Sequence, residues 1–416
     1  MKKNNHPDFI GQLLNTKGGR AYRFLYERPE GTPFPDLPYW EDIIGQILLG
    51  LVMEIGDAVG INLSELNQHL LILGRAGAGK TNLIYLLFYQ LFLLVSCWFF
   101  DFKQDYRHLL HYTKNILIFR WQSLKINPLR PPDGTDPRKW IQTFSDIFCL
   151  SSGLMGASKN LLLQTINELF ELYGVYKGSD TYPSMLILSE MLNRKFHRKG
   201  LPNDTVGYLT RLLNKIEPLC MIMEDVFDCD QGYSLEDLLQ KHVIFELDGL
   251  TEEFQTFMVN YLLAFLFTYR IERGQRGQMD LAVIFDEASR VFKRNTPKDL
   301  GTPYVEQIVR LIRDFGVALI VADQMPHALA DSIKSNVSTM IAMPLSNGKD
   351  IDDVARAMRL TKDQATYLGA QGIGEGIVKL AGRHPSPFPI AIPHFPIQRT
   401  ITDQEVANHM RSAYGI

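Results

Sequence analysis

The amino-acid sequence predicts an α/β fold with a parallel-rich central sheet, an all-helical insertion and a small strand-rich cap before the sheet. Two observations support this prediction. Short apolar runs that end in polar residues alternate with helical patterns over residues 67–133 and again over residues 241–396, which is typical of a doubly wound parallel sheet. Between these ranges, residues 134–240 carry apolar residues at three- and four-residue spacing without strand-like alternation, which indicates helices.

Five segments follow from these patterns. Short apolar runs between Ile43 and Ile61 are punctuated by glycines, which indicates small strands before the core. The predicted segments are an N-terminal strand and loop cap (1–66), the first part of the core (67–133), the helical insertion (134–240), the second part of the core (241–396) and a C-terminal tail with a short polar helix (397–416).

A glycine-rich loop follows the first apolar run of the core, Leu70–Leu73. Its pattern is GxxxxGK[ST], and a helical apolar run comes directly after it, which is the context that a P-loop requires. Glycines let the backbone N–H groups converge on a phosphate, and the helix that begins there adds its positive end. The alternative is an ordinary glycine-rich turn. The predicted nucleotide-binding residues are Gly74, Arg75, Ala76, Gly77, Ala78, Gly79, Lys80, Thr81 and Asn82.

Five residues are predicted to carry the chemistry of phosphoryl transfer. We expect Lys80 to reach the β- and γ-phosphates and the Thr81 hydroxyl to bind Mg²⁺. Asp286 and Glu287 end an apolar strand, where the first would hold the metal and the second would act as general base. Gln324, at the tip of the following strand, is placed to sense the γ-phosphate or to position the attacking water. For the last three residues the alternative is a polar cap at a strand end.

The acid pair also indicates the class of P-loop protein. A strand between the P-loop strand and the acid strand, with a glutamate beside the metal-binding aspartate, is typical of RecA-like ATPases. The chain has no guanine-reading [NT]KxD string, so ATP is preferred over GTP. ATP and Mg²⁺ are therefore the expected cofactors.

Three arginines are candidates for a further cation at the transferred phosphate, a role that a neighbouring subunit often supplies. Arg310 and Arg313 share one face of the predicted helix Thr302–Phe315, and Arg383 lies in the loop after Leu380. Arg313 is the first choice. A surface salt bridge is the commoner explanation for any one of them.

Asp101 and Lys103 follow the predicted second core strand, Val95–Phe100. Because the carboxyl ends of parallel strands face the ligand crevice, we expect both side chains near the nucleotide or a neighbouring subunit. The alternative is a solvated loop with a structural aspartate cap.

The run Leu83–Phe100 is apolar except for Gln90 and Ser96, and it reaches the length of about 18 residues that suits a membrane span. We favour a buried helix followed by a buried strand, because the helix must begin at Lys80 to serve the phosphate. No membrane association is expected.

The remaining elements follow from apolar spacing. Leu63–Leu66 is expected to be a turn, and the basic cluster Arg194–Lys199 is either a solvated face or a contact to nucleic acid. Further strands are predicted at Ile116–Phe119, Val243–Asp248, Leu281–Glu287, Val317–Gln324, Thr339–Met343, Ile377–Leu380 and Ile390–Ile392. Further helices are predicted at Lys139–Cys149, Lys159–Leu172, Pro183–Arg194, Asp204–Met223, Ser234–Gln240, Glu252–Arg270 and residues 401–412.

The overall composition limits the choice of partners and compartment. The net charge of the 416 residues is −3, which excludes a strongly basic coat but not a local basic strip. The polar residues after Met1-Lys2-Lys3 do not form a signal peptide. The four cysteines are scattered without a CxxC pair, which indicates reduced thiols and a cytoplasmic protein.

Several short strings together resemble the HerA/FtsK superfamily of P-loop ATPases, with the HerA branch nearest and the coupling ATPases of conjugation next. The resemblance covers about residues 45–395, and the P-loop is its most specific part. The strings are His69–Gly74 before the P-loop, Asp101–Lys103, Ile126–Leu129, Asp286–Glu287, Arg313–Val317 and Ala322–Gln324.

The resemblance implies a homo-oligomer, typically a hexameric ring, that uses ATP to move double-stranded DNA, with a nuclease or antiphage effector as partner. The usual Thr-Gln after the sensor strand is Asp323-Gln324 here, which implies altered sensing. The segment before the P-loop is shorter than the β-barrel that family members usually carry, and it lacks the membrane helices of coupling proteins.

From the sequence we expect a ring-forming, Mg²⁺-dependent ATPase that translocates or remodels DNA. One alternative is a nucleotide-bound ring scaffold that assembles an effector without moving DNA. A second is a coupling ATPase of conjugation or secretion.

Overall fold

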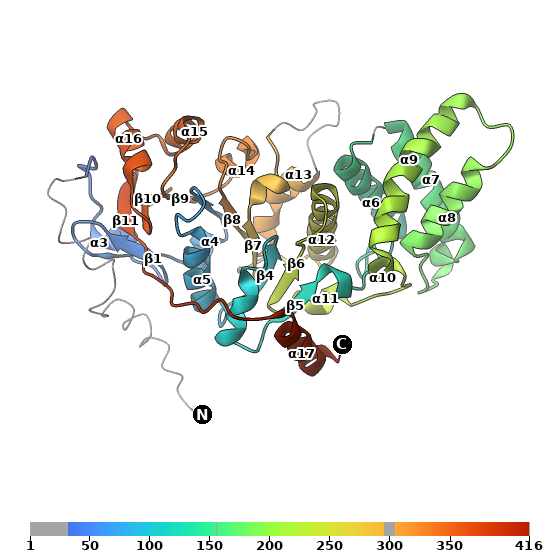
Figure 1. The fold of residues 1–416 in the computed structure, drawn as a ribbon, viewed down its shortest axis with the longest axis horizontal. Helices are drawn as coiled ribbons and strands as arrows, with labels where there is room; N and C mark the ends of the chain where they lie inside the picture. The colour runs from blue at the N-terminus through green and yellow to red at the C-terminus, as the bar shows by residue number, and fades with distance from the viewer. Residues whose placement is uncertain (1–31, 155, 295–303, 416) are drawn as a thin grey trace.

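The computed structural model describes residues 32–154, 156–294 and 304–415. A long twisted sheet forms one part of the molecule, and a group of helices labelled α6 to α10 extends from one end of it (Figure 1). The C-terminal helix lies near the junction of the two parts.

The sheet has eleven strands in the described part of the chain, in the order β2-β1-β11-β10-β9-β3-β8-β7-β4-β6-β5. The strands from β9 to β5 are parallel to their neighbours. The other pairs, β2 with β1, β1 with β11, β11 with β10 and β10 with β9, are antiparallel. The strands are β1 Ile47–Val52, β2 Ala58–Ile61, β3 Leu70–Leu73, β4 Ser96–Asp101, β5 Leu117–Arg120, β6 Val243–Glu246, β7 Leu281–Asp286, β8 Val317–Asp323, β9 Thr339–Ala342, β10 Glu375–Leu380 and β11 Phe388–Ala391.

Several of the apolar runs that predicted the core strands form strands that are buried along their whole length. Every residue of β3, β7 and β8 is buried, as expected for parallel strands that helices cover on both faces. The prediction of a parallel-rich α/β sheet is therefore confirmed.

The first two strands extend this same sheet instead of forming a separate unit. They make an antiparallel hairpin, and β1 continues the sheet by pairing Leu51 with Ala391 of β11. A Cβ at Gly60 would lie 2.5 Å from the Gly45 carbonyl oxygen, so the hairpin needs glycine at this close approach. The strands predicted within Ile43–Ile61 are present, and a cap boundary at residue 66 stays a prediction.

One strand separates the P-loop strand from the acid strand. β8 lies between β3 and β7, with Leu73 paired to Asp323 and Asp286 paired to Ala322. The carboxyl ends of these three strands therefore meet at one edge of the sheet, where a ligand binds in open α/β folds.

The apolar run Leu83–Phe100 is divided between a helix and a strand. α5 spans Lys80–Leu91, and β4 begins at Ser96. Across the described residues, no helix combines the length and the apolar character that crossing a membrane requires.

The helical group packs onto the core through aromatic side chains. Phe144 and Phe148 of α6 place their rings 6.3 and 5.8 Å from the Phe257 ring of α12. Its helices are α6 Pro137–Ser152, α7 Gly156–Leu172, α8 Met185–Phe196, α9 Asn203–Ile222, α10 Glu224–Phe227 and α11 Leu235–Leu238. The limits of an insertion at residues 134 and 240 stay a prediction.

The other helices include several that the apolar patterns missed. α15 Gly348–Met358 and α16 Lys362–Ala370 lie between two strands where no helix was expected, and Leu63–Leu66 is one helical turn, α4. The predicted helix Thr302–Phe315 is α13, Tyr304–Leu311, followed by the tighter turn Ile312–Phe315, and Thr302 lies outside the described residues. The rest are α3 Trp40–Ile43, α12 Glu252–Glu272, α14 Asp331–Ser335 and α17 Asp403–Tyr414, with 3₁₀ turns at Tyr106–His111, Trp121–Ser123, Val175–Lys177 and Ala288–Arg290.

After the last strand, residues 393–402 cross the P-loop helix and lead to α17. The Asn82 side chain donates to the Pro393 carbonyl at 2.9 Å and accepts from the Phe395 N–H at 2.7 Å. The Arg107 guanidinium, held by Glu246, also pairs with Asp403 at 2.5 Å. The C-terminal segment is thus fixed at both of its ends.

Candidate nucleotide-binding site

The glycine loop turns from β3 into α5 through two left-handed glycines. Gly77 has φ 74° and Gly79 has φ 112°, a region that favours glycine. A Cβ at Gly74 would lie 2.9 Å from Met343 Cβ, so this position also needs the absence of a side chain. Arg75, Ala76 and Gly77 are exposed, and Ala78 is buried.

Lys80 begins α5 and points back over the loop. Its ammonium donates to the carbonyl oxygens of Gly74 at 2.7 Å and Arg75 at 3.1 Å. Burial lowers the pKa of this lysine, while the charge of Asp286 acts in the opposite direction. A buried ammonium between loop carbonyls and an acid is placed to neutralise a phosphate anion.

Thr81 and Asp286 meet although 205 residues separate them. The Thr81 hydroxyl donates to Asp286 Oδ2 at 3.4 Å, and the Tyr106 hydroxyl donates to the same oxygen at 3.0 Å. Burial raises the pKa of Asp286, against the attraction of Lys80. One hydroxyl and one carboxylate suit Mg²⁺, which keeps waters and phosphate oxygens as its other ligands. Accordingly, the described residues contain no cluster of three His, Cys, Asp or Glu side chains that would cage a metal alone.

Glu287 lies beside the metal pair in a strained backbone conformation. Its φ is 62°, which costs energy for a residue other than glycine and is typical of functional sites. Gln324 Nε2 donates to Glu287 Oε1 at 2.6 Å, and Lys103 pairs with the same oxygen. Arg290 donates to Oε2 through Nε at 2.8 Å. The structure thus brings both acids, Lys103 and Gln324 to one place.

Asp323 stabilises the loop that presents Gln324. Its carboxylate is fully buried and accepts the N–H groups of Ser289 at 2.5 Å and Met325 at 2.6 Å. Burial raises the pKa of Asp323, and these two hydrogen bonds act against that rise. This aspartate, which departs from the usual threonine, therefore links the turn after Glu287 to the loop after β8.

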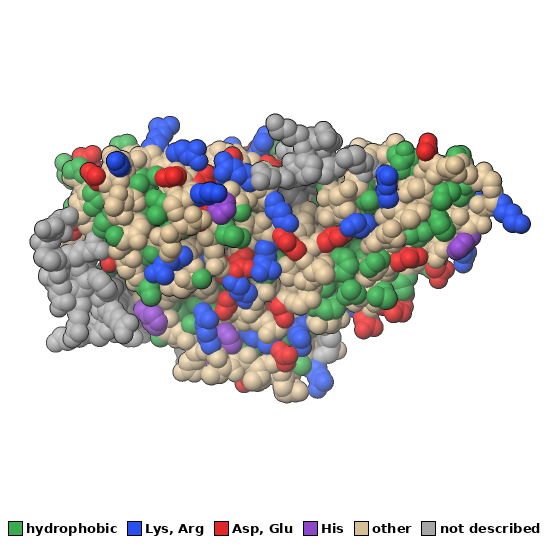
Figure 2. Space-filling view, turned by 45° about the horizontal axis from the view of Figure 1, so that its top comes forward, with side chains coloured by type: hydrophobic (Ala, Val, Ile, Leu, Met, Phe, Trp, Pro, Cys, Tyr) green, Lys and Arg blue, Asp and Glu red, His purple; other side chains and the backbone are tan. Residues whose placement is uncertain are grey.

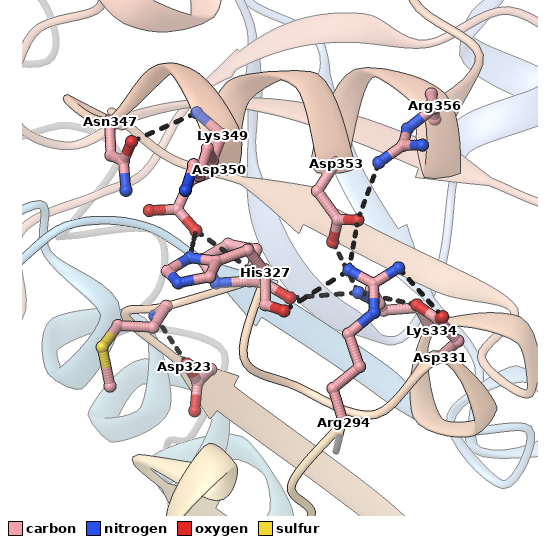
Figure 3. Close-up of polar contacts among 12 residues, drawn as sticks. Arg294, Asp323, His327, Asp331, Lys334, Asn347, Lys349, Asp350, Asp353 and Arg356 are labelled. Atoms are coloured by element: carbon pink, nitrogen blue, oxygen red, sulfur yellow. Dashed lines mark hydrogen bonds and ion pairs between the residues drawn. The ribbon is translucent and has the colours of Figure 1, made fainter.

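A network of hydrogen bonds and ion pairs fixes the other end of that loop to α15 (Figure 3). His327 Nδ1 lies 2.7 Å from Asp350 Oδ1. Arg294 pairs with Asp331 at 3.0 Å and with Asp353 at 3.2 Å. Since Asp350 and Asp353 are buried, the loop after β8 is held at both ends.

The predicted arginines lie away from this centre. Arg310 and Arg313 are exposed, and Arg313 Nε lies 3.8 Å from the Asp314 carboxylate. Arg383 instead pairs with Glu65 at 2.6 Å and donates to the Ile44 carbonyl at 2.7 Å. Its guanidinium is therefore occupied within its own chain.

Two further side chains of the site had no assigned role in the sequence. Tyr106 contacts Asp286, and Arg290 contacts Glu287. The three-residue spacing between Glu287 and Arg290 could have predicted their contact. Nothing in the sequence connects Tyr106 with an acid 180 residues later. Asn82 was predicted at the nucleotide, but its side chain is bonded to residues 393 and 395.

Known proteins share both the sequence and the fold of this chain. The family model described as "Helicase HerA, central domain" matches residues 47–266, more than half of the chain. The one described as "Helicase HerA-like C-terminal" matches residues 221–411. The DNA double-strand break repair helicase HerA of Sulfolobus acidocaldarius is 24% identical over 344 residues, and that of Saccharolobus solfataricus is 22% identical over 341. Each alignment covers 80% of this chain and 66% of the relative.

Solved structures agree with the fold. VirB4 of Thermoanaerobacter pseudethanolicus matches with a TM-score of 0.68 at 20% identity, over 85% of this chain and 97% of that one. The plasmid coupling protein TrwB, in complex with a non-hydrolysable ATP analogue, matches with 0.62 at 14% identity, over 89% and 98%. With the two family models together matching residues 47–411 and the P-loop geometry in place, the chain belongs to the helicase HerA family of P-loop ATPases.

Proposed function

We propose that this protein hydrolyses ATP with Mg²⁺ at the edge where β3, β7 and β8 end. The observation that supports this most directly is the 3.4 Å contact between the Thr81 hydroxyl and Asp286. It brings the phosphate loop and the acid strand together, so that one hydroxyl and one carboxylate could hold a shared metal. In this proposal the bound Mg²⁺·ATP supplies the phosphoryl group and its metal.

Each neighbouring side chain then has a defined task. Lys80 neutralises the phosphates, and Thr81 with Asp286 holds the metal. Glu287 accepts the proton of the attacking water, and Gln324, bonded to Glu287 at 2.6 Å, orients that water. Tyr106 donates to Asp286 and keeps its carboxylate turned toward Thr81.

Two substitutions test the assignment. Glu287→Gln removes the base but keeps the shape, so ATP turnover should fall by about 10²–10⁴-fold while ATP binding persists. Lys80→Ala should abolish binding as well. Phosphate release and fluorescent nucleotide binding measure the two effects, and normal turnover in either variant would rule out this site.

We further propose that the protein forms a ring, typically a hexamer, that translocates or remodels double-stranded DNA in the cytoplasm. The relatives named as helicases support this proposal. In a ring, the exposed Arg313 or Arg310 would serve the nucleotide of the adjacent subunit. Arg383 is a poor candidate because its guanidinium is occupied. A nuclease or effector partner is part of the same proposal.

One region of the surface carries several exposed basic side chains. On the face shown in Figure 2, basic and acidic side chains alternate, and basic ones gather over the side of α15 and α16. The exposed basic residues there are Lys349, Arg356, Arg359 and Lys362. A local strip of this kind would bind phosphates in a strongly salt-dependent manner.

The DNA role is tested by ATP turnover with and without duplex DNA, and by electron microscopy with a non-hydrolysable ATP analogue. Translocation predicts strong stimulation by DNA and rings with density in the pore. Rings without stimulation would support the scaffold alternative, and monomers under both conditions would refute the ring.

A further inference from the structure

Lys103 is held at the site by a rigid loop. The Asp101 carboxylate accepts the N–H groups of Lys103 at 2.9 Å and Tyr106 at 2.8 Å. Gln104 adopts the left-handed φ of 60° and donates to Asp248 at 2.8 Å. The backbone around Lys103 is therefore held by hydrogen bonds, while its side chain is 45% exposed.

The two oxygens of Glu287 have different surroundings. Oε2 accepts from Arg290, whose guanidinium is itself anchored by the buried Gln255 at 3.3 Å and lies 5.5 Å from the Phe102 ring centre. Oε1 faces Gln324 and Lys103. Oε2 is thus bound by a guanidinium that has further contacts, and Oε1 by an ammonium whose side chain is 45% exposed.

This arrangement conflicts with general base catalysis unless one contact changes. A carboxylate that accepts a proton from water must present an oxygen to that water within hydrogen-bond reach. Lys103 competes for that place on Oε1, and Arg290 cannot leave Oε2 without losing its own anchors. The contact that can be exchanged is the one from Lys103.

A terminal phosphate is the chemically suited competitor for this ammonium. Lys103 and Tyr106 come from the same loop, and Tyr106 contacts the acid that faces Thr81. The lysine contacts the base, and its charge also acts on Asp286 and Lys80, the residues expected at the metal and the phosphates. Lysine binds phosphate as a compact point charge, and its four-carbon stem can swing between two anions.

We propose that Lys103 is a sensor of the γ-phosphate that leaves Glu287 to bind the terminal phosphate of a nucleoside triphosphate, and that Arg290 is a positioning residue that keeps Glu287 aimed. This inference rests on the proposed ATPase function. A nucleoside diphosphate lacks the γ-phosphate that attracts Lys103. Lys103 therefore stays paired with Glu287 Oε1 when only the diphosphate is bound.

The proposal predicts selective loss of triphosphate affinity. Lys103→Met should weaken binding of a non-hydrolysable ATP analogue with Mg²⁺ by about tenfold, as expected for one lost charge-assisted contact, and leave ADP affinity unchanged. Lys139→Met is the matched control, because Lys139 is an exposed lysine that pairs with Glu272 on another surface. It should change neither affinity.

Arg290→Gln gives the second measurement. If Arg290 only positions the base, kcat for ATP should fall about tenfold while KM and the ratio of ADP to analogue affinity stay unchanged, and Arg290→Lys should restore part of kcat. Thermal unfolding of each variant confirms that it is folded.

The outcomes separate this inference from the proposed function. A wild-type protein that binds neither nucleotide would overturn the ATPase assignment itself. A wild type that binds both, together with a Lys103→Met variant that loses ADP and analogue affinity equally or loses neither, would overturn the sensor role alone.

Discussion

His69, the residue before the P-loop strand, connects the strand to its neighbours through one neutral ring. Its Nδ1 accepts the Leu319 N–H at 3.1 Å, so Nε2 carries the proton and donates to the Val309 carbonyl at 3.0 Å. Burial lowers the pKa of this histidine to about 4. The folded protein therefore keeps His69 neutral where the unfolded chain protonates it.

The first prediction concerns this pH dependence. Below pH 6.5 His69 is protonated in the unfolded chain, whereas in the folded protein it stays neutral down to about pH 4. The free energy of unfolding therefore falls as the pH is lowered from 6.5 to about 4. His69→Asn should remove about 2 kcal/mol of the loss between pH 7 and pH 5. Urea unfolding at both pH values measures it, with the exposed His197→Asn as control. A constant difference between wild type and variant would contradict the assignment.

A second prediction concerns Tyr106. Tyr106→Phe removes only the hydroxyl that donates to Asp286, so the Mg²⁺ concentration for half-maximal ATP turnover should rise by about tenfold, the value of a hydrogen bond to a charged group. Tyr176→Phe, which loses a bond to Asn167 in the helical group, should not change it. An unchanged Mg²⁺ requirement in Tyr106→Phe would remove this residue from the metal site.

Residues linked by a local pattern could be predicted, and residues linked only through the fold could not. Lys80 and Thr81 follow from loop spacing, and Asp286 from its place at a strand end. Tyr106 reaches Asp286 across two neighbouring strands, and that approach depends on the strand order, which no short string encodes. The role of Arg383 was obscured for the same reason, since its partners Glu65 and Ile44 are more than 300 residues away.

At the scale of elements, strands were recognised more reliably than surface helices. A parallel strand buried on both faces is an unbroken apolar run, and β7 and β8 show this plainly. In α15, by contrast, Asp350 is buried with a hydrogen bond to His327 and Asp353 with an ion pair to Lys334, so polar residues occupy positions where apolar residues would indicate a helix. Such a helix is stabilised by contacts that the sequence alone does not display.

A third prediction belongs to the junction between α6 and α12. Phe257 is buried and meets the rings of Phe144 and Phe148. Phe257→Ala should lower the free energy of unfolding by about 3–5 kcal/mol, because it leaves a cavity where the rings interlock. Leu172→Ala, at a position 71% exposed on α7, should change it by less than about 0.5 kcal/mol. Equal effects in urea titrations would show that the junction is not a packed core.

For the whole molecule, the family and the sheet were predictable while the sheet's full extent was not. The hairpin of β1 and β2 was expected as a cap, yet it continues the sheet through β11, a strand more than 320 residues later. Hairpins are encoded locally, but their docking on a distant strand is decided by the assembled edge. The division into core and helical insertion stays a proposal.

A fourth prediction tests the attachment of the C-terminal helix. Asp403 pairs with Arg107 at 2.5 Å and with Arg120 at 3.1 Å. Asp403→Ala should loosen α17 and speed proteolytic cleavage within residues 393–402 several-fold, since cleavage follows the population of the opened segment. Asp363→Ala, on the exposed side of α16, should not. Cleavage rates that match the wild type would show that other contacts hold the helix.

Asn82, one position past Thr81, is tied by two hydrogen bonds to the crossing segment at residues 393–395. The segment that leads to α17 is therefore connected to the first turn of α5, although more than 300 residues separate them in the sequence. A force applied to α17, by a fused tag or a bound protein, would be transmitted through residues 393–402 to the first turn of α5. A change at α17 would accordingly reach the helix that follows the phosphate loop through this segment.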